Sequence, residues 1–424
     1  MNYKWVILWL LFFASVISYL DRSALAIVAP LIVKDMNLSP SELGIAFSSF
    51  FAGYALFCFV GGYFADKIGP YKVLTASMSV WSVFCALTAA VASIPALLVV
   101  RLVFGMGEGP LNTNLNKLVS QWFERSKQAT ALGLANSGLQ VGGAIAGPVV
   151  GFLALNYGWR PAFVIIGGIG FLWLIAWVIL GSDSPATNRW VKKKLAATST
   201  ESSAAAVAPS SQTPKIPLKT YLFSRQILVT AYAYFGYAYI LYFFLSWFPS
   251  YLVTAQNLDL KTMSFVNIIP WIFGMIGLAL GGWISDILFK RTGSAVLARK
   301  IVIAGGLIIS AIFVALAGMM SGVVAAVALM GGSILFMQMT LSSYWAMILD
   351  IVEPARVGGV GGFMHLIANM GGIVAPAVTG FLLEKTGLFS SAFVVCGLVA
   401  VSGALVIIFC VSSKHSFEAS EPQA

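Results

Sequence analysis

The stretch Gly61-Gly-Tyr-Phe-Ala-Asp66-Lys67-Ile-Gly69 decides the fold, because a close variant of it returns in the second half of the chain. The counterpart is Gly281-Gly-Trp-Ile-Ser-Asp286, followed by Lys290-Arg291-Thr-Gly293. A second motif is also duplicated, since Gly142-Gly-Ala-Ile-Ala-Gly147-Pro148 is matched by Gly371-Gly-Ile-Val-Ala-Pro376. Internal repeats at corresponding places indicate that the chain consists of two related halves.

Composition places both halves in a membrane. Of the 424 residues, 59% are hydrophobic and only 9% are charged, whereas soluble proteins carry about 25% charged residues. Apolar segments of about 20 residues recur along the whole chain, and each is long enough to cross a bilayer. The first segment lacks a small-residue cleavage site, which predicts a retained helix, with a cleaved secretory signal as the alternative. We predict twelve spans, near residues 7–32, 43–65, 73–93, 96–118, 129–155, 161–181, 226–252, 264–288, 301–319, 322–348, 358–383 and 389–411.

The predicted fold is an all-α membrane protein with twelve transmembrane helices in two pseudo-symmetric six-helix halves. Between Gly181 and Thr220 the composition shifts to Ser, Thr, Ala and Pro with a run of lysines, which predicts a flexible cytoplasmic linker. We expect an N-terminal bundle over residues 1–181, the linker over 182–220, a C-terminal bundle over 221–412 and a cytoplasmic tail over 413–424.

Basic residues predict the orientation of the spans. They concentrate in the N-terminal tail, in the linker and in the loops on the same side, which the positive-inside rule assigns to the cytoplasm. The opposite side holds only Lys34, Arg160, Lys261 and Lys385. Both termini are therefore expected in the cytoplasm, and the net charge of +10 reflects topology, not nucleic-acid binding. The four cysteines fall in apolar segments and are expected to be buried thiols.

Two pairs of charged residues interrupt the apolar spans. Asp21 and Arg22 adjoin each other in the first span, while Arg101 and Glu108 lie about two turns apart on one face of the fourth. Each charge at bilayer depth costs at least about 2.5–3.5 kcal/mol, so these side chains are expected to line a polar cavity. Arginine is suited to two-point binding of a carboxylate. A buried acid whose arginine partner comes and goes can load and release a proton, and static salt bridges are the alternative.

These features resemble the major facilitator superfamily, whose Gly-x-x-x-Asp-Lys-x-Gly turn is represented in both halves. A narrower resemblance is carried by Tyr19-Leu-Asp21-Arg22, by Arg101-x6-Glu108-Gly-Pro110, by Trp122-Phe123 with Arg125, and by Tyr242-Phe-Phe-Leu-Ser-Trp247-Phe-Pro249. These motifs are similar to the anion:cation symporter family, which includes bacterial galactonate, glucarate and hexuronate carriers and the animal sialic acid and vesicular glutamate transporters. The resemblance implies transport of an organic anion, in bacterial members with protons.

The resemblance also implies roles for individual residues. One of Arg22 and Arg101 would hold the substrate carboxylate and the other would pair with an acid; the case for a structural or gating role is the stronger for Arg22. For Arg101 the alternative is a structural ion pair with Glu108 or Asp21. Glu108 would link substrate and proton, with Asp21 as the second protonation site. Further candidate substrate contacts, for which hydrogen bonding between helices is an equal alternative, are Tyr19, Tyr54, Gln140, Tyr234, Ser342, Ser343, Trp345, His365 and Asn369.

Two acidic residues at the duplicated turns are expected to act in gating. By resemblance, Asp66 and Asp286 would make charge contacts with Arg125 and Arg356 that hold one conformation. His365 departs from the family pattern, because related sugar-acid carriers have asparagine near this position, and it could add a titratable group. This departure leaves the identity of the substrate open.

The expected function is a proton-coupled symporter that imports a small organic anion by alternating access, with a sugar acid such as a hexonate or hexuronate as the favoured substrate. A carrier of aromatic acids or dicarboxylates is the alternative in substrate, and an anion sensor is the alternative in function. The sequence has no nucleotide-binding, metal-ligand or nucleophile motif, so we expect no enzyme activity, cofactor or metal. The expected partners are the anion, protons and the lipid bilayer, and a monomer in a bacterial inner membrane is favoured.

Overall fold

The computed structural model describes residues 3–191, 216–353 and 356–411. Its contacts group the described chain into two compact units, one formed by residues 3–191 and 252–268 and the other by 216–251, 269–353 and 356–411. The predicted linker over 182–220 falls largely outside the described residues, and the predicted tail over 413–424 lies wholly outside them. The bundle boundaries at 181 and 221 therefore stay predictions.

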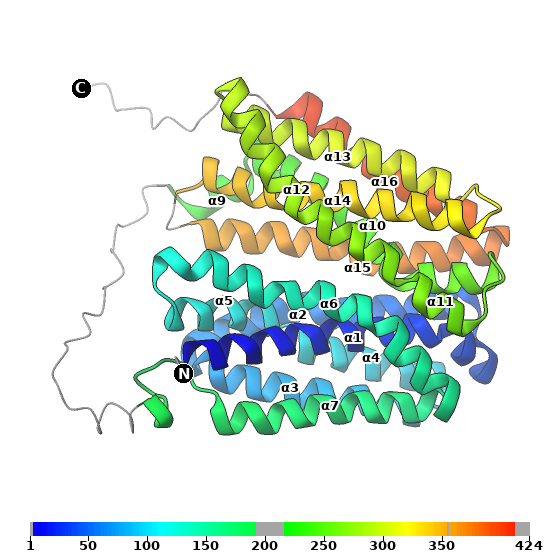
Figure 1. Ribbon diagram of the computed structural model, residues 1–424. Coiled ribbons are helices and arrows are strands. Elements are labelled where there is room, and N and C mark those ends of the chain that lie inside the picture. The colour runs from blue at the N-terminus through cyan, green and yellow to red at the C-terminus, as the bar shows by residue number, and fades with distance from the viewer. Residues whose placement is uncertain (1–2, 192–215, 354–355, 412–424) are drawn as a thin grey trace, which may run out of the picture. The chain divides into compact units, whose positions relative to one another are not determined.

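The first unit consists of helices that pack in pairs. Helix α1 packs along α6, α2 along α4 and α3 along α7, and α11 contacts α6 (Figure 1). Their bounds are α1 Lys4–Met36, α2 Pro40–Ile68, α3 Pro70–Leu87, η1 Thr88–Ala90, α4 Ile94–Glu108, α5 Leu111–Trp122, α6 Arg125–Tyr157, α7 Trp159–Leu180 and α11 Leu260–Val266.

The second unit is also helical in its described residues. Helix α13 packs against both α14 and α16, and α15 contacts α16. The bounds are α9 Leu218–Leu222, α10 Arg225–Thr254, α12 Ile268–Thr292, α13 Ala295–Ala317, α14 Val323–Ile351, α15 Val357–Thr386 and α16 Phe389–Cys410.

Twelve helical segments of the described chain are long and apolar enough to cross a membrane, which confirms the predicted twelve spans. Helices α4 and α5 together form one segment over 94–122, and α11 and α12 form another over 260–292. The helix ends follow local signals. Ser39 and Glu42 form a capping box at the start of α2, and Pro40 and Pro70 stand at first helical positions. Gly69, with φ of 91°, makes the tight turn between α2 and α3 that a residue with a Cβ would strain.

Helices α2 and α4 approach until their backbones touch. A Cβ on Gly53 would lie 2.0 Å from the Leu102 carbonyl oxygen, and a Cβ on Gly105 would lie 2.0 Å from that of Phe50. Only glycine fits at such contacts, because real Cβ atoms do not approach a backbone oxygen so closely. This contact fixes Phe50 and Tyr54 of α2 beside the charged residues of α4.

The fourth span is interrupted where α4 gives way to α5. Pro110 lacks an N–H group and therefore removes one bond from the helical ladder. Side chains supply hydrogen bonds around this break: the Ser77 hydroxyl donates to the Gly107 carbonyl oxygen at 2.7 Å, and the Asn114 amide donates to that of Pro110 at 2.7 Å. Glu108 is thus the last residue of α4 and lies directly before the break.

Candidate functional site

A buried ion pair between Glu108 of α4 and Arg22 of α1 forms the centre of the candidate site. The residue exposures are 0% for Glu108 and 7% for Arg22. Glu108 Oε1 accepts hydrogen bonds from Arg22 Nη2, from Arg22 Nε at 3.1 Å and from the Ser18 hydroxyl at 2.6 Å. Glu108 Oε2 has no hydrogen-bond partner among the described residues. One carboxylate oxygen is therefore heavily engaged, and the other is available to a proton or a donor.

Aromatic rings surround the Arg22 guanidinium. Its central carbon lies 4.6 Å from the ring centre of Tyr54, 4.8 Å from Tyr19 and 5.3 Å from Phe50. Cation–π contacts of this kind stabilise a desolvated guanidinium by up to about 2 kcal/mol. The Tyr54 hydroxyl in turn accepts a hydrogen bond from the Asn112 amide at 3.2 Å. The predicted ligands Tyr19 and Tyr54 therefore lie directly against Arg22.

Arg101 is the second buried cation of this unit, with 2% of its surface exposed. Its guanidinium carbon lies 4.8 Å from the ring centre of Phe50 and 4.9 Å from that of Phe104. Arg101 Nε has no hydrogen-bond partner, and no described carboxylate forms an ion pair with this residue. The alternative of a structural pair with Glu108 or Asp21 is thus not formed among the described residues, and both cations lie near the ring of Phe50.

Asp21 turns toward α3 instead of toward either arginine. Its Oδ2 accepts a hydrogen bond from the Trp81 indole N–H at 2.6 Å, while its Oδ1 has no partner in the described chain. The carboxyl group is completely buried. Asp21 therefore anchors α1 to α3 through one oxygen and leaves the other available.

Gln140 is the remaining candidate of the first unit. It is buried on α6, the helix that packs along α1, with 9% of its surface exposed. Its side-chain oxygen accepts no hydrogen bond from the described residues. An unsatisfied buried amide oxygen is rare, so Gln140 is suited to accept a hydrogen bond from a ligand or from water.

The candidates of the second unit gather around an aromatic cluster. Tyr234 stacks on Tyr344 with ring centres 4.7 Å apart, and its ring lies 6.2 Å from that of His365. Trp345, which is 41% exposed, lies 6.4 Å from His365. The Tyr242 hydroxyl donates to Asn369 Oδ1 at 2.5 Å, and the Asn369 amide donates to the His365 carbonyl oxygen at 2.8 Å.

The two adjacent serines of α14 have different surroundings. The Ser343 hydroxyl lies 3.5 Å from that of Ser285, which also accepts a hydrogen bond from Arg299 at 2.5 Å. Ser343 is thus linked through Ser285 of α12 to Arg299, a charged residue near the start of α13. The Ser342 hydroxyl is buried without a hydrogen-bond partner among the described residues.

The predicted gating contacts differ from those in the structure. Asp66 pairs with Lys117 at 2.6 Å, and Arg125 begins α6 with a side chain outside the described part of the protein. The predicted pairing of Asp286 with Arg356 is not formed among the described residues of this structure. Asp286 lies 3.4 Å from Arg299, at the start of the next helix, and Arg356 Nε donates to the Ile216 carbonyl oxygen at 3.3 Å. Arg299 also lies 3.7 Å from Asp350, so one cation bridges α12 and α14.

Several residues of these networks were absent from the sequence prediction. Ser18 lies four residues before Arg22, so the helical period places both on one face, and that spacing could have identified it. Trp81 stands in the middle of an apolar span, where an indole N–H needs a buried partner. Phe50, Tyr237 and Gln338 carry no comparable signal, although the Tyr237 hydroxyl donates to Gln338 Oε1 at 2.6 Å. Within the described residues, no group of three His, Cys, Asp or Glu side chains could hold a metal ion.

Comparison with known proteins identifies the family. The model of the Major Facilitator Superfamily matches residues 11–345, which is well over half of the chain. The chain belongs to the major facilitator superfamily. Its members and the relatives below are transporters, so this chain is a multi-pass membrane transporter and not an enzyme.

Relatives within the superfamily indicate the class of substrate. The chain is 44% identical over 400 residues to a hexuronate transporter of Bacillus subtilis, covering 94% of this chain and 92% of that protein. It is 35% identical over 394 residues to a probable sulfoacetate transporter of Cupriavidus necator, covering 93% and 90%. These matches confirm the resemblance to sugar-acid carriers and support transport of an organic anion.

The similarity to a solved structure bears on the fold and not on the function. The inward-facing, occupied form of a bacterial homologue of the human lysosomal transporter Spinster aligns with a TM-score of 0.73 at 17% identity, covering 97% of this chain and 96% of that chain. This similarity confirms the predicted twelve-helix major facilitator fold.

Proposed function

We propose that this transporter imports a sugar acid, such as a hexuronate, together with protons by alternating access. The observation that carries the proposal is Arg101, a buried cation without a carboxylate partner among the described residues. A permanently charged guanidinium is unfavourable in a membrane unless an anion offsets its charge. The 44% identity to a hexuronate transporter supports a sugar acid as that anion.

Arg101 is the proposed ligand for the substrate carboxylate. Its planar guanidinium offers parallel N–H donors that match the two oxygens of a carboxylate. The rings of Phe50 and Phe104 lie within 5 Å of the guanidinium carbon and can stabilise its charge by cation–π contact. Hydroxyl groups of the sugar would then bind polar side chains, with Gln140 as the acceptor in the first unit.

Glu108 is the proposed coupling residue. When it is ionised, its charge neutralises Arg22. When it takes a proton, Arg22 loses this counter-charge and the neighbourhood of both arginines becomes more attractive to an anion. Binding of the proton and binding of the anion therefore favour each other, which is the linkage that a symporter needs. Asp21, with one unpartnered oxygen, is the proposed second protonation site.

Five residues of the second unit are also proposed to contact substrate. Tyr234, Trp345 and His365 would contribute aromatic rings, and Asn369 and Ser342 would contribute polar side chains. Asp66 and Asp286 are proposed to hold one conformation through Lys117 and Arg299. Both termini are proposed to lie in the cytoplasm of a bacterium, with the protein in the inner membrane.

A short dianion is the second candidate substrate. Two buried arginines within reach of the same Phe50 ring would suit a molecule with two acidic groups. The probable sulfoacetate transporter is a relative at 35% identity, and sulfoacetate carries both a carboxylate and a sulfonate. This candidate falls within the alternative of a dicarboxylate-type carrier.

Uptake by purified protein in proteoliposomes tests the proposal. We expect uptake of glucuronate or galacturonate to rise when the outside is made acidic, and we expect unlabelled hexuronate to compete better than sulfoacetate, succinate or benzoate. Competition only by sulfoacetate or succinate would favour the second candidate. Binding of hexuronate without any uptake or exchange would indicate a sensor and would refute transport of the sugar acid.

A further inference from the structure

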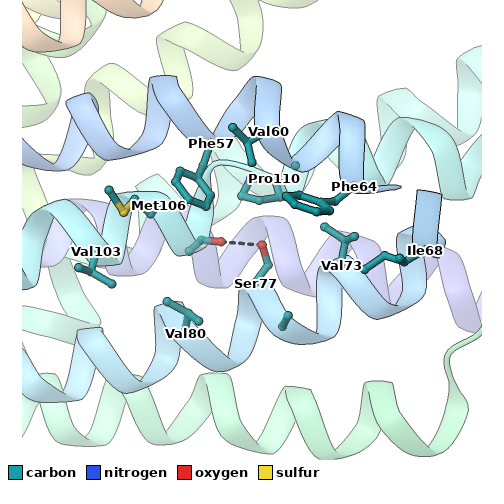
Figure 2. A pocket seen from close by; sticks show the side chains of 13 residues that line it. Phe57, Val60, Phe64, Ile68, Val73, Ser77, Val80, Val103, Met106 and Pro110 are labelled. Atoms are coloured by element: carbon teal, nitrogen blue, oxygen red, sulfur yellow. Dashed lines mark hydrogen bonds between the residues drawn. The ribbon is translucent and has the colours of Figure 1, made fainter. Parts of the chain in front are cut away.

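An open pocket lies at the surface of the first unit, between α2, α3 and α4, and it has a volume of about 300 Å³ (Figure 2). Figure 2 shows that its walls are apolar side chains from all three helices. Its rim is open, because Phe64, Ile68 and Val80 are 46%, 50% and 37% exposed. The other large lining residues are Phe57, Val60, Val73, Val103 and Met106.

The chemistry of this pocket excludes a sugar acid. Ser77 carries the one side-chain hydroxyl of the lining, and that hydroxyl donates to the Gly107 carbonyl oxygen at 2.7 Å. A charged or hydroxylated molecule would therefore lose its hydration without gaining hydrogen bonds. All three helices belong to segments that can cross a membrane, so the exposed rim meets hydrocarbon. An aliphatic chain is the ligand that suits such a pocket.

Positive charge marks one end of the pocket. Helix α2 ends at Ile68 and α3 begins at Pro70, so this end lies where two spans leave the membrane. Lys67 precedes the lining residue Ile68, and Lys72 precedes the lining residue Val73; both lysines are exposed. The Lys67 ammonium lies 4.6 Å from the ring centre of Tyr63.

Nearby acids already have partners of their own. Asp66 pairs with Lys117 at 2.6 Å, and Asp183 accepts a hydrogen bond from the Tyr71 N–H at 2.7 Å. Lys67 and Lys72 form no ion pair with a described carboxylate. The end of the pocket therefore offers two cations to an anionic group at the membrane surface.

We propose that this pocket binds an anionic phospholipid of the bilayer, with one acyl chain between α2, α3 and α4 and the phosphate near Lys67 and Lys72. Hydrocarbon fills the apolar walls, and the headgroup complements the two lysines. The floor of the pocket includes Gly107 and Pro110, which flank Glu108 at the break between α4 and α5. The lipid would thus contact the residues on either side of Glu108 at this break.

Native mass spectrometry of the purified full-length protein tests this site. The protein is incubated with phosphatidylglycerol or with phosphatidylcholine of identical acyl chains, and bound lipids are counted. Ala76→Phe places a ring in the pocket, since Ala76 is an exposed lining residue. Ala328→Phe is the matched control, because Ala328 is an exposed alanine of the spanning helix α14. The double variant Lys67→Gln/Lys72→Gln removes the proposed headgroup contacts and leaves the pocket intact.

We expect wild type and Ala328→Phe to retain at least threefold more phosphatidylglycerol than phosphatidylcholine. Ala76→Phe should retain several-fold less of both lipids, and the double lysine variant should lose only the preference for phosphatidylglycerol. Equal lipid retention by Ala76→Phe and wild type would overturn the proposal. A dimer of the wild-type chain that Ala76→Phe abolishes would also overturn it, because the occupant would then be a second copy.

Discussion

Replacing Glu108 by glutamine tests whether a single carboxylate couples the anion to a proton. Glutamine keeps the length of the side chain and an oxygen that accepts hydrogen bonds from Ser18 and Arg22, but it has no charge and takes no proton. Loss of one partner of a buried ion pair destabilises a protein by about 3–5 kcal/mol. The retained hydrogen bonds should keep the loss near the lower end of this range, so the variant should still fold.

The size of the transport effect follows from the geometry of this carboxylate. Three donors occupy Oε1 and none occupies Oε2, so Glu108 has room for one proton. If Glu108 alone carries the coupled proton and Asp21 keeps its protonation state, cotransport of a monoanion moves no net charge, and a gradient of one pH unit supplies about 1.36 kcal/mol. Wild type should therefore accumulate a hexuronate about tenfold. Glu108→Gln should reach no accumulation, while its exchange of labelled for unlabelled substrate continues.

The assay uses proteoliposomes that are one pH unit more acidic outside than inside, with labelled glucuronate, and a parallel counterflow experiment without a gradient. Glu124→Gln is the matched control, because Glu124 is exposed at the start of α6 and makes no capping hydrogen bond there. It should accumulate substrate like wild type. If Glu108→Gln also reaches the wild-type level, Glu108 is not the coupling group and the reasoning fails.

Three further predictions concern the surroundings of this residue. Arg101→Lys should weaken hexuronate binding at least tenfold in a calorimetric titration, because the two-point geometry is lost. The control Arg160→Lys, at a partly exposed ion pair on the surface, should leave the affinity unchanged. Equal affinities for both variants and wild type would remove Arg101 from the site. Trp81→Phe should lower the free energy of unfolding by about 1–3 kcal/mol, because Asp21 loses its hydrogen-bond donor. The control Trp283→Phe, at a residue that is 64% exposed, should leave this free energy unchanged. Similar thermal or denaturant unfolding curves for the two variants would contradict the role of Trp81. Gly105→Ala should destabilise the protein by about 1–3 kcal/mol, because the new methyl group meets the Phe50 carbonyl oxygen. The control Gly282→Ala should not change the stability, since there is open space around Gly282. Unchanged stability of Gly105→Ala would disprove the close contact of α2 and α4.

Much of the fold was predictable from the sequence because a bilayer imposes simple requirements. A spanning helix needs about 20 apolar residues, so the twelve spans follow from the apolar segments alone. The charged residues Arg22, Arg101 and Glu108 could be identified for the same reason, since each is exceptional in such a segment. Their burial in one unit agrees with the expectation that they do not face lipid.

The pairing of these charges could not be predicted from spacing along one helix. Arg101 and Glu108 share a face of the fourth span, but Glu108 pairs with Arg22 of α1 because α1 brings both Ser18 and Arg22 to it. Likewise Asp286 takes Arg299, the cation at the start of the next helix, in place of the predicted Arg356. Choice of partner depends on how helices pack, and packing depends on small residues such as Gly53 and Gly105, which one sequence does not mark as contacts.

The contact of α2 with α4 has a consequence for changing the cargo of this transporter. Gly53 and Gly105 admit no larger residue, so the spacing of these two helices cannot be widened gradually by mutation to accept a bulkier anion. New specificity would have to come from side chains of the proposed substrate site, such as Gln140, and not from moving the backbone that carries Arg101. A directed-evolution library would therefore be productive at the former positions and would yield mostly misfolded protein at the two glycines.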